Sequence, residues 1–225
     1  MKKAQLLLLV VLCTAITASA QVRRSISILG DSYSTFAHHV TPDTNYVWYP
    51  QERVESNNVV SVRQTWWHQL ILNNGFRLCV NNSFSGATIC NTGYQGADYS
   101  DRSYCTRLNR LGSPDIIIVF GGTNDTWAHS PIGDYKYDGW SAADLYQFRP
   151  AMSFLLSGLL DRYPGTAVYV VINDILSDDV THSMQTICDY YAVPYIQLHD
   201  IDKQSGHPSI LGMQQIAEQV AAAIK

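Results

Sequence analysis

A serine near one end of the chain and a histidine near the other could together perform nucleophilic catalysis. Ser32 follows Gly-Asp directly after a short apolar run, and His207 precedes a proline close to the C-terminus. A serine hydroxyl becomes a nucleophile when an imidazole within hydrogen-bond reach takes its proton. Each residue also has an ordinary interpretation, because Asp-Ser after a strand is a common turn or cap. A lone histidine is likewise more often structural than catalytic.

Two glycine- and asparagine-containing segments could supply the second half of such a site. Gly86 ends the segment Asn-Asn-Ser-Phe-Ser-Gly, and Asn124 lies in Gly-Gly-Thr-Asn-Asp, each after an apolar run. Glycine lets a backbone amide approach a ligand closely, and an asparagine amide can donate to a developing oxyanion. Either segment alone is also an ordinary turn, so the interpretation depends on the combination.

These four segments need a scaffold, and the apolar pattern predicts alternating strands and helices. Short apolar or β-branched runs predict strands at residues 25–30, 77–81, 115–120, 167–172 and 194–198. Longer segments with helical spacing predict helices at residues 64–74, 142–162, 178–191 and 209–224. An alternation of this kind favours a single domain with one parallel sheet and helices on both of its faces.

Three long segments, at residues 35–62, 86–114 and 126–140, fall outside these elements. Each follows a predicted strand, and ligands of open parallel sheets bind where the strands end. The segments are rich in Tyr and Trp, which argues against disorder, so we expect them to border the site. The aromatic run at residues 46–49 could stack on sugar rings, although packing of the loop on itself is the simpler interpretation.

The composition narrows the class of protein. The chain has 225 residues, of which 46% are hydrophobic and 15% charged, and this suits one globular domain. Lys and Arg number 15 against 19 Asp and Glu, a net charge of −4 without a basic stripe, so we expect no nucleic-acid partner. The one long apolar run is at the N-terminus, which excludes a multi-span membrane protein.

The N-terminus has the three parts of a secretory signal peptide. Two lysines precede an apolar stretch at residues 6–12, and an Ala-Ser-Ala sequence that ends at residue 20 fits a cleavage site. We therefore expect a signal peptide at residues 1–20, a single domain at 21–225, and export to the periplasm or the medium. The apolar stretch is too short for an anchor, so we expect no stable membrane insertion after cleavage.

Cysteine and histidine spacing predicts neither a metal nor another cofactor. The sequence has no Cys-x-x-Cys motif, and the neighbouring His38 and His39 would point to opposite sides of an extended segment. Export permits disulfides, and Cys90 and Cys105 flank a polar loop. We expect these two to pair, and the other two cysteines of the mature chain to be buried thiols.

The four segments together resemble the SGNH (GDSL-type) hydrolase family, over about residues 25 to 225. Gly-Asp-Ser ending at Ser32 is similar to the nucleophile block, with Tyr33 where the signature has leucine. Gly86 falls at the second-block glycine, residues 122–125 match the third block, and His207 with its proline matches the last. The resemblance implies a flavodoxin-like three-layer α/β/α sandwich with a five-stranded parallel sheet, and ester hydrolysis through a serine.

The family's roles transfer to the matching residues of this chain. Ser32 would be the nucleophile, and His207 would take its proton and then protonate the leaving alcohol. The backbone amides of Ser32 and Gly86 and the side chain of Asn124 would form the oxyanion hole.

One position departs from the family pattern. Gln204 stands where the family usually has an aspartate three residues before the histidine. Asp202 is the preferred substitute, since a shift of two residues in a loop could still bring it to His207, and Asp200 is the next acid upstream. Alternatively, a backbone carbonyl orients the imidazole and the site is a Ser–His dyad.

The resemblance therefore implies an exported serine esterase that acts on a small-molecule or glycan ester. Short acyl groups such as acetyl are expected, because no broad apolar helix or lid pattern favours long chains. A carbohydrate-binding module that has lost turnover is one alternative, which the missing aspartate keeps open. A lipid esterase of lysophospholipase or thioesterase type is another.

Overall fold

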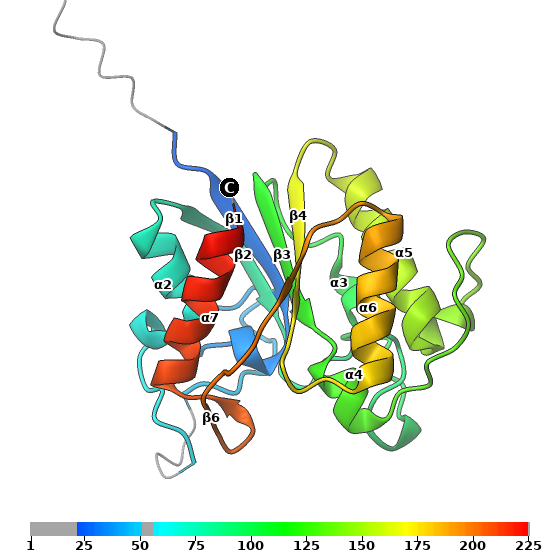
Figure 1. The fold of residues 1–225 in the computed structure, drawn as a ribbon, viewed down its shortest axis with the longest axis horizontal. Helices are drawn as coiled ribbons and strands as arrows, with labels where there is room; N and C mark the ends of the chain where they lie inside the picture. Colours follow the sequence, from blue (N-terminus) through cyan, green and yellow to red (C-terminus); the bar gives the residue numbers. More distant parts are fainter. Residues whose placement is uncertain (1–21, 51–55, 225) are drawn as a thin grey trace, which may run out of the picture.

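A five-stranded parallel sheet forms the centre of the molecule, which the computed structural model describes over residues 22–50 and 56–224. The strand order is β2-β1-β3-β4-β5, which is the flavodoxin-like order. Helices cover both faces of the sheet (Figure 1). The predicted three-layer α/β/α sandwich is confirmed. The predicted signal peptide at residues 1–20 lies outside the described residues.

The strands agree with the apolar runs that predicted them. They are β1 (Ser25–Gly30), β2 (Arg77–Ser83), β3 (Ile116–Gly121), β4 (Ala167–Ile172) and β5 (Tyr195–Gln197). Two of the predicted ranges match the observed bounds, and the other three differ by one or two residues at one or both ends. β1 and β3 are buried along their whole length, as central strands of a sheet covered on both faces must be.

The helices divide into two layers. Helices α2 (Trp66–Asn73) and α7 (Ile210–Ala223) cover one face, and α3 (Tyr104–Arg107), α5 (Phe148–Arg162) and α6 (Asp178–Tyr190) cover the other (Figure 1). Side chains of β3 alternate between the two cores, because Ile118 packs with α2 and α7 whereas Val119 packs with α5 and α6. None of the helices in the described ranges is long and apolar enough to cross a membrane.

Short elements account for most of the difference from the prediction. The predicted helix at 142–162 divides into a 3-10 turn, η4 (Asp144–Tyr146), and α5, whose first turn contains Pro150. A proline is tolerated there because the first amides of a helix have no intrahelical acceptor. Helix α4 (Thr123–Ala128) and the two-residue strands β6 (Lys203–Gln204) and β7 (His207–Pro208) are too short to produce a recognisable pattern.

The predicted Cys90–Cys105 disulfide is wrong. All four cysteines in the described residues are free thiols. The sulfur of Cys90 donates to the carbonyl of Thr92 at 3.5 Å, and that of Cys105 donates to the carbonyl of Ala151 at 3.3 Å. Both thiols are buried, and burial raises their pKa well above the ordinary value, so they act as small core side chains.

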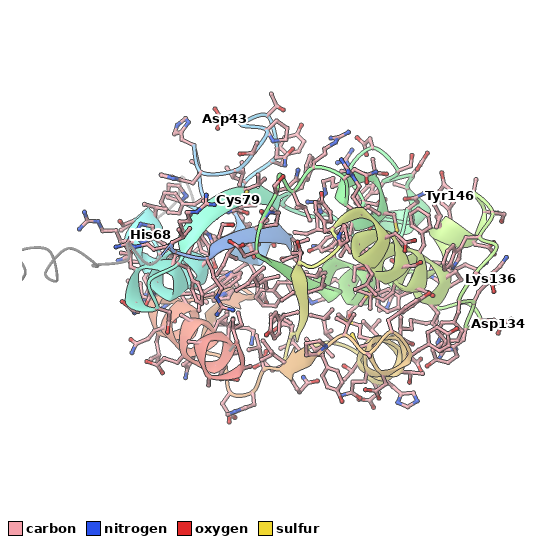
Figure 2. The ribbon with its side chains drawn as sticks, turned by 90° about the horizontal axis from the view of Figure 1, so that it is seen from above. Asp43, His68, Cys79, Asp134, Lys136 and Tyr146 are labelled. Atoms are coloured by element: carbon pink, nitrogen blue, oxygen red, sulfur yellow. The ribbon has the colours of Figure 1, made fainter. Side chains whose placement is uncertain are left out.

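The middle of the third long segment, residues 126–140, packs beside α5 and α6. Figure 2 shows Asp134 and Lys136 on the opposite side of the molecule from His68 of α2. Lys136 forms a 2.7 Å ion pair with Asp144, which fixes the segment beside α5. Tyr137 of the same segment stacks on Tyr190 of α6 with ring centroids 3.7 Å apart, so this part of the segment packs against the helix layer.

Candidate active site

The predicted site residues converge at one end of the sheet. Ser32 opens a 3-10 turn, η1 (Ser32–Ser34), directly after β1, and Asn124 lies in α4 directly after β3. His207 begins β7, in a hairpin with β6. Figure 1 shows α4 and the β6 hairpin at the same end of the sheet. The topology therefore brings together segments that lie far apart in the sequence.

Ser32 and His207 are in direct contact. The Oγ atom of Ser32 lies 2.9 Å from Nε2 of His207, although 175 residues separate them. The two side chains are nearly buried, with exposed fractions of 3% and 7%. Asp31 caps the turn by accepting the Tyr33 amide at 3.0 Å, which fixes the backbone that carries the serine. This geometry is that of a hydroxyl and the base that takes its proton.

A backbone carbonyl faces the other nitrogen of the imidazole. Nδ1 of His207 lies 3.2 Å from the carbonyl oxygen of Ser205. Ser205 and Gly206 connect β6 to β7 with φ angles of 52° and 75°, as in a two-residue type I′ hairpin turn. Because Nδ1 donates its proton to this carbonyl, Nε2 is left free to accept a proton from Ser32.

Asp202, the acid expected to orient His207, lies elsewhere. Its carboxylate accepts the hydroxyl of Ser209, and its carbonyl accepts the Ser209 amide at 3.1 Å. In the antiparallel pairing of β6 with β7, Gln204 is opposite His207, so Asp202 comes opposite Ser209. The expectation is therefore corrected, and in the described residues the imidazole contacts the Ser205 carbonyl rather than a carboxylate.

Two other polar side chains that precede His207 also have partners elsewhere. The exposed carboxylate of Asp200 pairs with His199 at 3.1 Å. Oε1 of Gln204 accepts the amide of Asn58 at 2.9 Å, which ties the hairpin to the first long loop.

Three side chains that sequence reasoning did not assign to the site hold the hairpin in place. The phenol of Tyr33 donates to the carbonyl of Gly206 at 2.6 Å, and the phenol of Tyr49 donates to the carbonyl of Pro208 at 2.7 Å. The buried amide of Asn57 donates to the same Pro208 carbonyl at 3.1 Å. Tyr33, the residue that departs from the leucine of the family signature, is the one that meets the hairpin turn.

Aromatic rings enclose the imidazole. The indole of Trp48 stacks on His207 with ring centroids 3.7 Å apart and an interplanar angle of 6°. Trp127 meets the imidazole at 5.9 Å with a T-shaped geometry. Burial lowers the pKa of His207 to about 4, and the hydrogen bond to Ser205 opposes this shift. At neutral pH the resting histidine is therefore unprotonated and can act as a base.

Asn124 is held in a defined orientation by two hydrogen bonds. Its Nδ2 donates to the carbonyl of Ala87 at 3.0 Å, and its Oδ1 accepts the phenol of Tyr94 at 2.8 Å. Burial raises the pKa of Tyr94 to about 12, so the phenol remains a donor at neutral pH. Because the carbonyl of Ala87 takes one of the two Nδ2 hydrogens, the other remains without an acceptor among the described residues. No motif in the sequence pointed to Tyr94.

The backbone amides of Gly86 and Ser32 are the other candidate donors. Gly86 has a φ of 80°, a left-handed conformation that favours glycine, in the turn after β2. The backbone amides of Gly86 and Ser32 donate to no other residue within the described ranges. Both N–H groups are thus available to an anion.

Asp125 stabilises the loop that carries these donors. Its carboxylate accepts the amides of Ile89 at 2.8 Å and Cys90 at 3.2 Å. Burial raises the pKa of Asp125 to about 6, and the two amides oppose the shift. The last residue of the Gly-Thr-Asn-Asp segment is therefore structural.

The buried guanidinium of Arg107 links the ends of β1 and β2. Arg107 donates to the carbonyl of Gly30 at 3.2 Å and to the carbonyl of Asn82. Burial raises the pKa of the neighbouring Asp31 to about 7, and the positive charge of Arg107 opposes that shift.

The described residues contain no group of three or more His, Cys, Asp or Glu side chains that could hold a metal ion.

The sequence matches the family model described as GDSL-like Lipase/Acylhydrolase over residues 24–224. The chain belongs to this family. The resemblance predicted from the four segments is confirmed, and membership makes the protein an ester-hydrolysing enzyme. A search of curated proteins found no match.

Two solved structures from Bacteroides, both described as GDSL-like lipases, are similar over nearly their whole length. The protein from Bacteroides ovatus is 58% identical with a TM-score of 0.87, and the match covers 90% of this chain and 98% of that one. The protein from Bacteroides uniformis is 55% identical with a TM-score of 0.89, and the match covers 91% and 96%. A family two carbohydrate esterase from Clostridium thermocellum shares the fold at 17% identity, with a TM-score of 0.61 and coverage of 90% and 63%.

Proposed function

We propose that this GDSL-family enzyme hydrolyses short-chain carboxylic esters, such as acetyl esters of glycans, through a Ser32–His207 dyad. The observation that carries the proposal is the 2.9 Å contact between Ser32 Oγ and His207 Nε2. The carbonyl of Ser205 on Nδ1 takes the orienting role that an aspartate has in a triad.

The proposed reaction proceeds through an acyl-enzyme. His207 takes the proton of Ser32 as Oγ attacks the ester carbonyl, and the resulting oxyanion accepts hydrogen bonds from the amides of Ser32 and Gly86 and from Nδ2 of Asn124. The imidazolium then protonates the leaving alcohol, and the acyl group stays on Ser32. His207 next deprotonates a water that attacks the acyl-enzyme, and collapse of the second intermediate releases the carboxylic acid and restores the serine.

The surroundings of Ser32 support a small acyl group on a larger alcohol. Only 3% of Ser32 is exposed, so a bulky acyl chain has little room beside the nucleophile. Trp127 and Tyr46 are 37% and 68% exposed, and such rings can pack against a sugar. The same fold carries the carbohydrate esterase of Clostridium thermocellum, whose structure was solved in complex with cellohexaose.

Hydrolysis of p-nitrophenyl esters of increasing chain length tests this proposal, with wild type beside Ser32→Ala and Ser34→Ala. The control serine lies two residues away, and its hydroxyl accepts the indole N–H of Trp66 at 3.1 Å. We expect turnover that is fastest on acetate, is lost in Ser32→Ala and persists in Ser34→Ala. Full activity of Ser32→Ala would reject the proposed nucleophile.

The chain-length series, together with a labelling experiment, also distinguishes the two alternative functions, a lipid esterase and a carbohydrate-binding module. A preference for long acyl chains would instead indicate a lipid esterase of lysophospholipase or thioesterase type. Absence of turnover, together with absence of Ser32 labelling by a serine-directed phosphonate, would favour a carbohydrate-binding module. Acetylated oligosaccharides, followed by acetate release, then test the glycan itself.

Export is part of the proposal. The lysines, apolar stretch and Ala-Ser-Ala sequence within residues 1–20 support a signal peptide. N-terminal sequencing of the protein recovered from the periplasm or the medium should give a chain that starts at Gln21. Recovery of the uncleaved chain from the cytoplasm would contradict export.

A further inference from the structure

The face of the His207 imidazole is covered by Trp48. Their planes are nearly parallel, at 6°, and their centroids are 3.7 Å apart. Tyr33 and Tyr49 contact the same ring at centroid distances of 5.2 and 6.3 Å. Both phenols donate to carbonyls of the hairpin, and burial raises the pKa of each, so they are neutral neighbours.

The proposed reaction places a positive charge in this enclosure. When His207 takes the proton of Ser32, a buried imidazolium forms, and an unpaired buried charge is costly. In a triad the aspartate offsets this cost. In the described residues of this chain, the Ser205 carbonyl meets Nδ1, and the ring is otherwise surrounded by Ser32 and by aromatic side chains.

We propose that Trp48 is a positioning residue that stabilises the imidazolium of His207 through its π face, in place of the missing aspartate. The inference rests on the proposed esterase function. A cation within about 6 Å of an indole centroid is attracted by the negative face of the ring, and the attraction is larger in a desolvated site. The 3.7 Å stack meets this geometry. The same contact fixes the plane of the imidazole and so keeps Nε2 directed at Ser32.

The backbone of Trp48 is itself held, so the indole is in place before the charge appears. Its amide donates to the hydroxyl of Thr35 at 2.9 Å, and its ring forms a T-shaped pair with that of Tyr49, with centroids 4.4 Å apart. Tyr49 in turn accepts the Ala37 amide at 2.7 Å through its carbonyl. A preorganised group of this kind stabilises the transition state without reorganisation during the reaction.

Fluorinated tryptophans at position 48 test the proposal, because fluorine withdraws charge from the π face and changes the ring volume little. Tryptophan with increasing fluorine content is introduced at this position alone, and kcat, KM and the melting temperature are measured. We expect kcat to fall stepwise with fluorine content, by about ten-fold for the most fluorinated ring, which corresponds to about 1.4 kcal/mol. KM and melting temperature should change little, and Trp48→Phe should retain more activity than Trp48→Leu.

The same series at Trp140 is the matched control. That indole is also half-buried, but it packs on Phe154 of α5 at 5.6 Å and donates to the carbonyl of Lys136 at 3.0 Å. Fluorination there should leave kcat unchanged. A kcat that is insensitive to fluorine at position 48, or equally sensitive at both positions, would overturn the proposal.

A second measurement keeps this proposal separate from the esterase proposal. NMR titration reports the pKa of His207 in the intact protein without any turnover. Fluorination at Trp48 should lower this pKa, because the protonated ring loses its stabilising face. If Ser32-dependent turnover is absent but the pKa falls, the stacking proposal stands and the esterase proposal fails. A pKa that is unchanged, or that rises because water enters, would mean that Trp48 only packs against the ring.

Discussion

Asp202 and Ser209 close the end of the hairpin that carries His207. The hydroxyl of Ser209 donates to the Asp202 carboxylate, and the Ser209 amide donates to the Asp202 carbonyl at 3.1 Å. Ser209 also caps α7 by accepting the amide of Gly212. The acid nearest to the imidazole in sequence is therefore used to join the hairpin to the helix.

Replacing Asp202 should affect stability more than catalysis. In Asp202→Asn, kcat and KM on p-nitrophenyl acetate should stay within about two-fold of wild type, whereas the free energy of unfolding should fall by ~1 kcal/mol, the size of one lost hydrogen bond. Asp200→Asn is the matched control, because its carboxylate is exposed and pairs only with exposed His199 in the described residues. A kcat lowered a thousand-fold in Asp202→Asn, but not in Asp200→Asn, would show that Asp202 acts as the acid of a triad.

The low pKa of His207 predicts activity that persists into acid solution. Burial lowers this pKa to about 4 from an ordinary value of 6.5, and the base is active only when it is neutral. As pH falls, kcat/KM should therefore stay level through pH 6.5 and decline only near pH 4. The measurement is the pH profile of kcat/KM on p-nitrophenyl acetate. A half-maximal rate near pH 6.5 would indicate a solvated imidazole and contradict the buried geometry.

The scaffold was predictable because its signals are local. Runs such as Ile116–Gly121 are apolar along their whole length, and no tertiary contact is needed to recognise them. The ends of β1 and β3 then place Ser32 and Asn124 at one end of the sheet, since parallel strands share their carboxyl end. The loop after β5 leads to the hairpin that carries His207.

The missing parts of the site depend on contacts that no local pattern encodes. Tyr94 meets Asn124 across 30 residues, and Tyr49 meets Pro208 across 159. The prediction that Asp202 orients His207 is wrong because of the hairpin register, which no local pattern specifies. A shift of one residue in that register changes which side chains are opposite each other. The disulfide prediction relied on spacing alone, and the thiol of Cys105 instead faces the carbonyls of Ile89 and Ala151.

Removal of the Tyr94 hydroxyl should weaken the oxyanion hole without removing a donor from it. Tyr94→Phe leaves Oδ1 of Asn124 without the 2.8 Å hydrogen bond that fixes the amide. We expect kcat to fall roughly ten-fold at nearly constant KM, less than the roughly 10²–10³ expected for Asn124→Ala. The control is Tyr99→Phe, a half-buried ring on the same loop whose centroid lies 6.5 Å from that of Tyr94. Equal effects of the two changes would assign Tyr94 to loop packing.

Alanine substitutions at Gly86 and at Gly165 together distinguish the effect of backbone strain from the loss of an oxyanion donor. Gly86 has a φ of 80°, and a Cβ atom added there would meet no heavy atom within 4 Å among those described. Gly165 has the same φ of 80° and the same open space, but it lies in the turn between α5 and β4. Alanine at either position is strained by ~1 kcal/mol, because L-residues rarely adopt this conformation.

Gly86→Ala and Gly165→Ala should therefore lower the melting temperature by similar amounts. We expect Gly86→Ala to relieve the strain by rotating the peptide, which turns its amide away from the proposed oxyanion, so kcat should fall by roughly 10²-fold, as for loss of one donor. Gly165→Ala should retain wild-type kcat, since its turn contacts no site residue among those described. Thermal denaturation and p-nitrophenyl acetate kinetics on both variants measure the two effects separately. A wild-type kcat in Gly86→Ala would remove this amide from the proposed oxyanion hole and leave Ser32 and Asn124 as its donors.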